Sequence, residues 1–256
     1  MRRPQIERLV PVGVALVLMM VVEFSVLQPK LQIARAAEIT KQSHIDNETN
    51  WGGDDRRVVP IKRWSVAFDS PENYIFALTN YKNKLYAGTS PEGRVYQYDG
   101  ASWSVAFDSP TTEIWCLTEY HDKLYAGGGW NGNGDPTEDG VVYVYDGSTW
   151  SVAFDSPEEE IFSLIVYQNK LYAATGWSGK IYVYDGASWS VAFDSSATNV
   201  FSLGLYENKL YAGASPDGLV YVYDSSTWSV AFDTPDIYIL SFSVYMNKLY
   251  SISSIT

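Results

Sequence analysis

A six-residue sequence, Trp-Ser-Val-Ala-Phe-Asp, occurs five times in this chain and constrains its fold more than any other feature. The copies begin at Trp64, Trp103, Trp150, Trp189 and Trp228, at a spacing of 39 residues that lengthens once to 47. A repeat of this period is typical of solenoids and propellers, in which each unit packs on its neighbours. The sequence therefore predicts an array of similar units in place of one irregular core.

Each repeat contains four short segments that alternate or favour β-branched and aromatic residues. In the first complete unit these segments are residues 74–81, 84–89, 94–98 and 103–107. The turns between them carry Asn, Gly and Asp, which tolerate left-handed backbone angles or accept hydrogen bonds from the backbone two residues on. We therefore expect an all-β fold in which each unit is a four-stranded antiparallel meander.

The number of copies of each segment predicts a closed ring. The first, second and fourth strands occur five times, but the third occurs clearly only four times. The missing copy is due after Ser253, and residues 57–63 stand before Trp64 where a third strand belongs. We expect a five-bladed β-propeller over residues 57–256, whose last blade joins carboxyl-terminal inner strands to amino-terminal outer strands and so removes exposed edges. Pro60 opposes this arrangement, because it cannot donate to a ladder on both sides.

Two slots of the repeat indicate how neighbouring units pack. The first strand carries a small residue at one slot, and the slot holds Ala77, Cys116, Ser163, Ser202 and Ser241. We interpret Cys116 as a small core residue and the repeated Trp as packing between units. The single cysteine excludes an internal disulfide.

The amino terminus has the pattern of an export signal. Three arginines precede an apolar run at residues 10–27, and Ala34-Arg35-Ala36 offers a cleavage site. We assign residues 1–36 to an export signal or an uncleaved membrane anchor and residues 37–56 to a linker. The formal net charge is −12 with no basic run, so we expect no nucleic-acid partner, and membrane contact only through an uncleaved signal.

The pattern Lys-Leu-Tyr-Ala-Gly, then Gly-x-Val-Tyr-x-Tyr-Asp-Gly, then Trp, as in residues 84–103, resembles bacterial β-propeller repeats related to the kelch and two-component-regulator propellers. The resemblance covers residues 57–256 and lacks the kelch double glycine and the Trp-Asp dipeptide of WD repeats. A five-bladed ring is also similar to the tachylectin family, and that resemblance implies sugar binding at several equivalent sites.

Variable positions of the repeat are the candidates for ligand binding. One group lies in the turn that enters each unit, and a second lies where Trp replaces the usual Ser-Pro between the second and third strands. The candidate residues are Tyr74, Glu113, Trp130, Glu158, Glu160, Trp177 and Tyr238. We expect them to share one loop face of the ring, although solvated turns and packed loops explain the same pattern.

The insertion at residues 129–140 is a candidate calcium site. Its alternating oxygen ligands are Asn131, Asn133 and Asp135, with Glu138 and Asp139 nearby. Pro136 stands where a calcium loop needs Gly, and Val142 stands at the closing Glu position. Apart from this calcium hypothesis we expect no cofactor.

Two functions are consistent with these features. The favoured hypothesis is an exported, non-catalytic recognition module that binds carbohydrate or protein, because an array of near-identical units offers no single asymmetric catalytic group. His44 and His121 do not suggest a triad or a zinc site. The alternatives are a polysaccharide hydrolase or lyase that uses Glu113, Glu158, Glu160 or Asp135, and a purely structural repeat.

Overall fold

The computed structural model describes residues 35–43, 60–130 and 140–254, and all regular structure in them is β-strand. Four antiparallel sheets of four strands, here called blades 1 to 4, form the body of the molecule. Blade 1 contains β3 (Tyr74–Tyr81), β4 (Lys84–Ser90), β5 (Arg94–Tyr98) and β6 (Trp103–Asp108). Blade 2 contains β7 (Glu113–Tyr120), β8 (Lys123–Gly129), β9 (Val141–Tyr145) and β10 (Trp150–Asp155).

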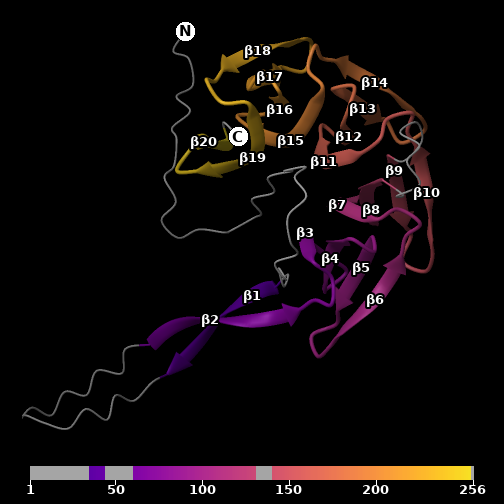
Figure 1. The fold of residues 1–256 in the computed structure, drawn as a ribbon, viewed down its shortest axis with the longest axis vertical. Coiled ribbons are helices and arrows are strands. Elements are labelled where there is room, and N and C mark those ends of the chain that lie inside the picture. Colours follow the sequence, from indigo (N-terminus) through magenta and orange to yellow (C-terminus); the bar gives the residue numbers. More distant parts are fainter. Residues whose placement is uncertain (1–34, 44–59, 131–139, 255–256) are drawn as a thin grey trace, which may run out of the picture.

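Blades 3 and 4 repeat the same meander. Blade 3 contains β11 (Ile161–Tyr167), β12 (Lys170–Thr175), β13 (Lys180–Tyr184) and β14 (Trp189–Asp194). Blade 4 contains β15 (Asn199–Tyr206), β16 (Lys209–Ser215), β17 (Leu219–Tyr223) and β18 (Trp228–Asp233). Figure 1 shows the blades side by side around an arc, with their first strands toward its centre and their fourth strands outside.

The hairpin turns have the backbone geometry that their residues predict. Both residues of each turn between a first and a second strand have positive φ, as at Lys82 (45°) and Asn83 (62°). This geometry matches the twist of paired strands. The third and fourth strands are joined by turns in which an Asp carboxylate accepts from two backbone N–H groups, as Asp99 does from Ala101 (2.8 Å) and Ser102 (2.9 Å). Turn chemistry therefore fixes where each strand ends.

Neighbouring blades are joined by a repeated aromatic contact. The Phe of one fourth strand stacks on the Trp of the next, and Phe193 and Trp228 have ring centroids 4.8 Å apart. The equivalent pairs are Phe68 with Trp103, Phe107 with Trp150, and Phe154 with Trp189. These contacts confirm that the repeated Trp packs between units, for the four Trp whose side chains are described.

The inner parts of the blades are packed too closely for larger residues at one slot. A Cβ added to Gly88 would lie 2.6 Å from Cγ2 of Ile114 in the next blade, and one added to Gly213 would lie 2.5 Å from Cγ2 of Ile239. Beside this slot, the small residues of the first strand bond the next blade, as Ser202 Oγ donates to the carbonyl of Ile239 at 2.9 Å. Small residues are needed where inner strands converge.

Two further sheets have only two strands each. One pairs β1 (Arg35–Ser43) with β2 (Pro60–Asp69), and the other pairs β19 (Tyr238–Tyr245) with β20 (Lys248–Ser254). They stand at the two ends of the arc (Figure 1). Among the described residues the structure thus has four complete blades, and the two halves expected to form a fifth are not paired.

The expected third strand at residues 57–63 is not the one observed. Residues 60–63 continue β2 into the hexapeptide strand, and the strand that pairs with β2 is β1. Because Pro60 is the first residue of β2, its missing N–H interrupts no ladder interior. β1 includes residues 37–43 of the segment assigned to a linker, and signal cleavage after Ala36 would remove its first two residues.

No helix in the described part of the chain is long and apolar enough to cross a membrane. The apolar run at residues 10–27 lies outside the described residues.

Candidate functional site

The inner ends of the blades bring most of the candidate residues onto one face. Tyr74, Glu113, Asn199 and Tyr238 are the first residues of their inner strands, and Glu160 immediately precedes β11. The turns that carry Trp130 and Trp177 follow β8 and β12 and lie at the same end, because each second strand runs antiparallel to the first. We call this set of seven residues the axial rim.

Hydrogen bonds hold the turns of the axial rim in place, both within a blade and between neighbouring blades. The backbone N–H and the Oγ1 hydroxyl of Thr112 both donate to the carbonyl of Trp130, at 2.6 and 2.8 Å. The backbone N–H of Trp177 donates to Oδ1 of Asn199 at 2.9 Å. The rim is therefore a set of loops held on a rigid scaffold.

The two tryptophans of the rim are large apolar side chains exposed to solvent. Trp130 is 52% exposed and Trp177 is 62% exposed. Both have positive φ, 50° and 65°, a conformation that a bulky residue adopts at a cost. Neither ring makes an aromatic contact among the described residues, so both are free to stack on a ligand.

Glu113 and Glu160 form the electrostatic centre of the rim. Burial raises the pKa of Glu113 to about 7, against a weak donation from Ser90 Oγ at 3.4 Å. Burial, together with the charge of Glu113, raises the pKa of Glu160 to about 8. The two carboxyl groups are thus within electrostatic reach of each other, and near neutral pH the pair retains a proton that it can donate to a ligand.

A row of half-buried aromatic rings runs along the inner strands below the rim. Phe76 stacks on Trp115 with centroids 4.2 Å apart, and Phe162 lies 4.7 Å from Phe201. Trp115 and Phe162 meet edge to face at 5.3 Å, and Tyr74 and Tyr238 extend the row at its two ends. The row therefore joins all five inner strands and gives the rim an apolar floor.

Glu158 lies apart from the rim, inside blade 3. Its Oε1 accepts from Tyr182 Oη at 2.8 Å and from Lys180 Nζ at 2.9 Å, and its side chain is 7% exposed. Burial pushes the pKa of Glu158 upward, but hydrogen bonds from these partners outweigh it and lower the pKa. Its carboxylate is committed to contacts within the blade.

Glu72 has the same role in blade 1. Its Oε1 accepts from Arg94 Nη1 at 2.8 Å and from Tyr96 Oη at 3.1 Å. Both acids therefore tie the turn that enters the blade to its third strand.

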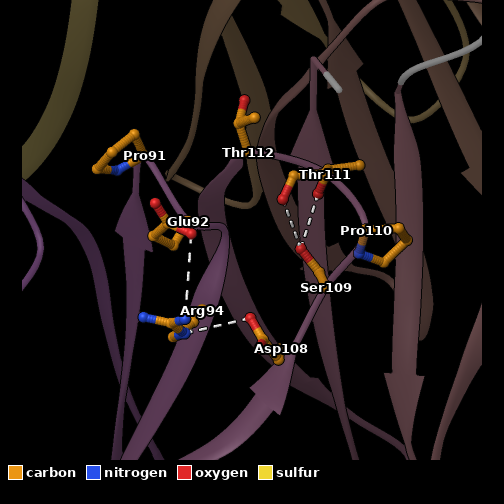
Figure 2. A pocket seen from close by; sticks show the side chains of 8 residues that line it. All are labelled: Pro91, Glu92, Arg94, Asp108, Ser109, Pro110, Thr111 and Thr112. Carbon is orange, nitrogen blue, oxygen red and sulfur yellow. Dashed lines mark hydrogen bonds and ion pairs between the residues drawn. The ribbon is translucent and has the colours of Figure 1, made fainter. Parts of the chain in front are cut away.

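A shallow pocket of about 470 Å³ lies beside blade 1, and its lining includes Thr112, which bonds the carbonyl of Trp130. Figure 2 shows Arg94 between the side chains of Glu92 and Asp108, while Ser109 bonds Thr111. Arg94 Nε donates to Asp108 Oδ1 at 3.2 Å, so the charges that line this pocket are already paired. We interpret it as a structural feature of the turn.

The remaining candidate groups do not form a reactive site in the described residues. The expected calcium ligands Asn131, Asn133, Asp135, Glu138 and Asp139 lie outside those residues, and within them no three His, Cys, Asp or Glu side chains are grouped to hold a metal ion. Burial raises the pKa of the Cys116 thiol to about 12, which leaves it unreactive. His121 stacks on Tyr120 at the opposite end of the blade.

Comparisons with known proteins bear on the fold alone. Neither a protein-family model nor a curated protein matches the sequence. Among solved structures, a chain of the nidogen/laminin complex is 11% identical with a TM-score of 0.60, and the alignment covers 87% of this chain and 83% of that one. A chain of the mitotic checkpoint complex is 13% identical with a TM-score of 0.53, with 87% of this chain and 77% of that one covered.

A third similar structure is the extracellular domain of a putative one-component system from B. thetaiotaomicron. It is 13% identical with a TM-score of 0.58, and the alignment covers 75% of this chain and 28% of that one. These likenesses agree with the repeated four-stranded sheets around an arc. The fold is a β-propeller. This confirms the fold predicted from the repeat, in a propeller with four complete blades among the described residues.

Proposed function

We propose that this propeller is an exported recognition module that binds carbohydrate or protein through the axial rim. The observation that carries the proposal is the exposure of Trp130 and Trp177 beside two carboxyl groups whose pKa values are raised by burial. Exposed tryptophans on a rigid scaffold are typical of binding surfaces, and adjacent hydrogen-bond donors give such a surface specificity.

The chemistry of the rim suits a ligand rich in hydroxyl or carbonyl groups. The proton that Glu113 and Glu160 retain near neutral pH provides an O–H donor, and the row of rings offers flat apolar contact. The similar structures support the protein alternative, since two of them come from protein complexes and one is an extracellular domain. That last likeness and the basic, apolar amino terminus support export.

A closed ring of five blades belongs to the same proposal. A closed ring would bring Tyr74 and Tyr238, at the two ends of the aromatic row, toward each other and would complete the rim. The five inner strands and the five copies of the hexapeptide support it.

A polysaccharide hydrolase or lyase is the second candidate, because Glu113 and Glu160 are coupled carboxyl groups beside a possible sugar platform. Glycoside hydrolysis requires one protonated carboxylic acid and one ionised carboxylate. Here burial raises both pKa values, to about 7 and about 8, so near neutral pH the pair can hold one acid and one carboxylate. Release of product therefore separates this candidate from the binding module.

The experiment is a glycan array and an affinity capture from envelope fractions, followed by binding measurements with rim variants. Trp130→Gly with Trp177→Gly removes both rings, and Gly suits the positive φ of both positions. The matched control is Met246→Gly, which removes an exposed apolar side chain at a positive-φ position on the opposite face.

We expect the double variant to lose at least tenfold in affinity for any ligand identified and the control to bind as wild type does. Equal binding by all three proteins would refute the assignment of the rim. For the hydrolase alternative, Glu113→Gln and Glu160→Gln should abolish any release of reducing ends from a bound glycan, whereas a binding module shows no release before substitution.

A further inference from the structure

The hairpin of β1 and β2 has the register of the outer half of a blade. Ala36 pairs with Phe68 and Ala37 with Val66, so that Ala67 is skipped on β2. The fourth strand of every complete blade skips the alanine at the same place in its hexapeptide, and these residues are Ala106, Ala153, Ala192 and Ala231. β1 therefore occupies the position of a third strand relative to β2.

This hairpin is already packed on blade 1 as an outer half would be. Phe68 stacks on Trp103 with centroids 4.3 Å apart and also contacts Tyr96 at 5.1 Å. The Trp103 indole N–H donates to the carbonyl of Ala67 at 3.1 Å. The same Phe contacts join blade 3 to blade 4, where Phe193 meets Trp228 and Tyr221.

The hairpin of β19 and β20 is packed on blade 4 as an inner half would be. Tyr206 Oη donates to the carbonyl of Asn247 at 2.8 Å, and Ser202 Oγ donates to the carbonyl of Ile239. Tyr167 makes the equivalent bond to Asn208 at the preceding junction, at 2.9 Å. Each half is thus docked on its neighbour, and only the pairing between the halves is absent from the described residues.

Apolar groups are left uncovered where the two halves would join. Phe232 is 40% exposed and makes no aromatic contact among the described residues, whereas its four counterparts each stack on a Trp. Tyr245 is 59% exposed, although its counterparts in β3, β7, β11 and β15 bond the next blade. Among the described strands β20 pairs only with β19, and the other edge of such a hairpin is a template for another strand.

We propose that β1 docks on the free edge of β20 in the same chain and completes a fifth blade in the order β19, β20, β1, β2. In blade 1 the second and third strands pair Leu85 with Tyr98 and Gly88 with Val95. Transferred to the fifth blade, this register pairs Leu249 with Ile39, Tyr250 with Glu38, Ser251 with Ala37, and Ile252 with Ala36. The third strand is then supplied by Arg35–Ser43, and the proposal holds whether or not the rim binds a ligand.

Ile252 makes this junction different from the other four. The equivalent slot holds Gly88, Gly127, Ala174 and Gly213, and Ala174 faces the smaller Val200 in the next blade. At the junction of blades 1 and 2, the counterparts of Ile252 and Ile75 are Gly88 and Ile114, and a Cβ at Gly88 would already lie 2.6 Å from Cγ2 of Ile114. Closure of the fifth blade in the same geometry therefore presses Ile252 against Ile75. Overpacking of this kind destabilises, so the fifth blade is the weakest junction of the ring.

The test is a disulfide between Glu38→Cys and Tyr250→Cys in the full chain. Cys116→Ala removes the native thiol, and Ala77 occupies that slot in blade 1. Opposed residues of an antiparallel pair lie within disulfide range. The control replaces Glu38→Cys by Gln97→Cys, which occupies the corresponding position in β5 and is already paired with β4.

We expect mild oxidation to give a monomeric, internally cross-linked product with the first pair and none with the control. A cross-linked dimer would overturn the proposal in favour of docking by a second copy, and no cross-link would overturn docking altogether. Hydrogen exchange of the wild-type protein provides a second measurement. Amides of residues 249–252 should be protected from exchange, although less than those of residues 210–213 in β16, and exchange as fast as in an open strand edge would contradict the proposal.

A separate variant, Ile252→Gly, tests the overpacked junction. We expect it to raise the thermal midpoint, although glycine in a strand ordinarily lowers it. A lowered midpoint, together with no cross-link in the first experiment, would place Ile252 outside any junction.

Discussion

Replacing Glu160 with Gln tests whether the rim carboxyl groups are protonated in the folded protein. The pKa of Glu160 is raised from 4.5 to about 8, mainly by burial. The folded state therefore keeps a proton that the unfolded chain releases. Stability from this group is complete below pH 4.5 and declines as pH rises to about 8, because the unfolded state binds fewer protons throughout that window.

The magnitude follows from the size of the shift. One pKa unit corresponds to about 1.4 kcal/mol, and after a discount for partial exposure and for coupling to Glu113 we expect a loss of about 3 kcal/mol between pH 4.5 and 8.5. Gln keeps the size and a hydrogen-bond donor but cannot ionise. Glu160→Gln should thus match wild type at pH 4.5 and exceed its stability by about 3 kcal/mol at pH 8.5.

Urea unfolding at pH 4.5, 6.5 and 8.5 measures this difference directly, because subtraction of the two curves removes all other titrating groups. Glu119→Gln, at an exposed position on the opposite end of β7, is the control and should follow wild type at each pH. Parallel curves for wild type and Glu160→Gln would refute the argument that burial keeps this carboxyl protonated.

Two further substitutions test the packing of the blades. Gly127→Ala places a Cβ 2.5 Å from Cys116 Sγ and 2.7 Å from Cγ2 of Ile161, so we expect a loss of about 2 kcal/mol in urea unfolding. Adding Cys116→Ser and Ile161→Val, the residues that accompany Ala174 at the junction of blades 3 and 4 (Ser163 and Val200), should recover at least half of that loss. Glu158→Ala leaves Lys180 without its partner and should lower the free energy of unfolding by about 2–3 kcal/mol. Adding Lys180→Leu, the residue at this position in blade 4, should restore most of that stability in a thermal scan. Additive losses in either set would contradict these contacts.

The repeated part of the fold could be predicted from the sequence because each level of information agrees with the next. The hexapeptide marks every fourth strand, and Asn at the second turn position, as at Asn83 and Asn169, permits the positive φ that hairpins need. The repeat count predicted five blades, and four of them are complete among the described residues. In physical terms, local turn chemistry and alternation decide these elements before any long-range contact forms.

β1 could not be predicted in this way. Its sequence, Arg-Ala-Ala-Glu-Ile-Thr-Lys-Gln-Ser, shares little with the third strands of the other blades, such as Arg-Val-Tyr-Gln-Tyr in β5. The segment is also separated from β2 by a long connection, so sequence adjacency favoured residues 57–63. Pairing of β1 with β2 depends on backbone register, which leaves no periodic signal in so short a strand.

The site was predicted in part. Six of the seven rim residues were expected from variable turns, but the turn sequence could not show that Glu158 points into its blade while Glu160 lies at the rim. The sequence does carry a signal for Glu158. In blades 1 and 3 an acidic residue in the entering turn, Glu72 or Glu158, accompanies a basic residue in the third strand, Arg94 or Lys180. Blades 2 and 4 have neither the acidic nor the basic residue at these positions. The aromatic row, at Phe76, Trp115, Phe162 and Phe201, also repeats at one slot, immediately before the small residues of the first strand, so the sequence does carry a signal for it.

The most direct test of the central claim is a hydrogen-exchange footprint of the propeller with an identified ligand. Recognition at the axial rim predicts slowed exchange in the turns that contain Thr112, Trp130, Glu160 and Trp177 and no change in the hairpins at the opposite face, such as residues 82–83 and 207–208. Slowed exchange confined to those opposite hairpins or to the outer strands β6, β10, β14 and β18 would contradict it.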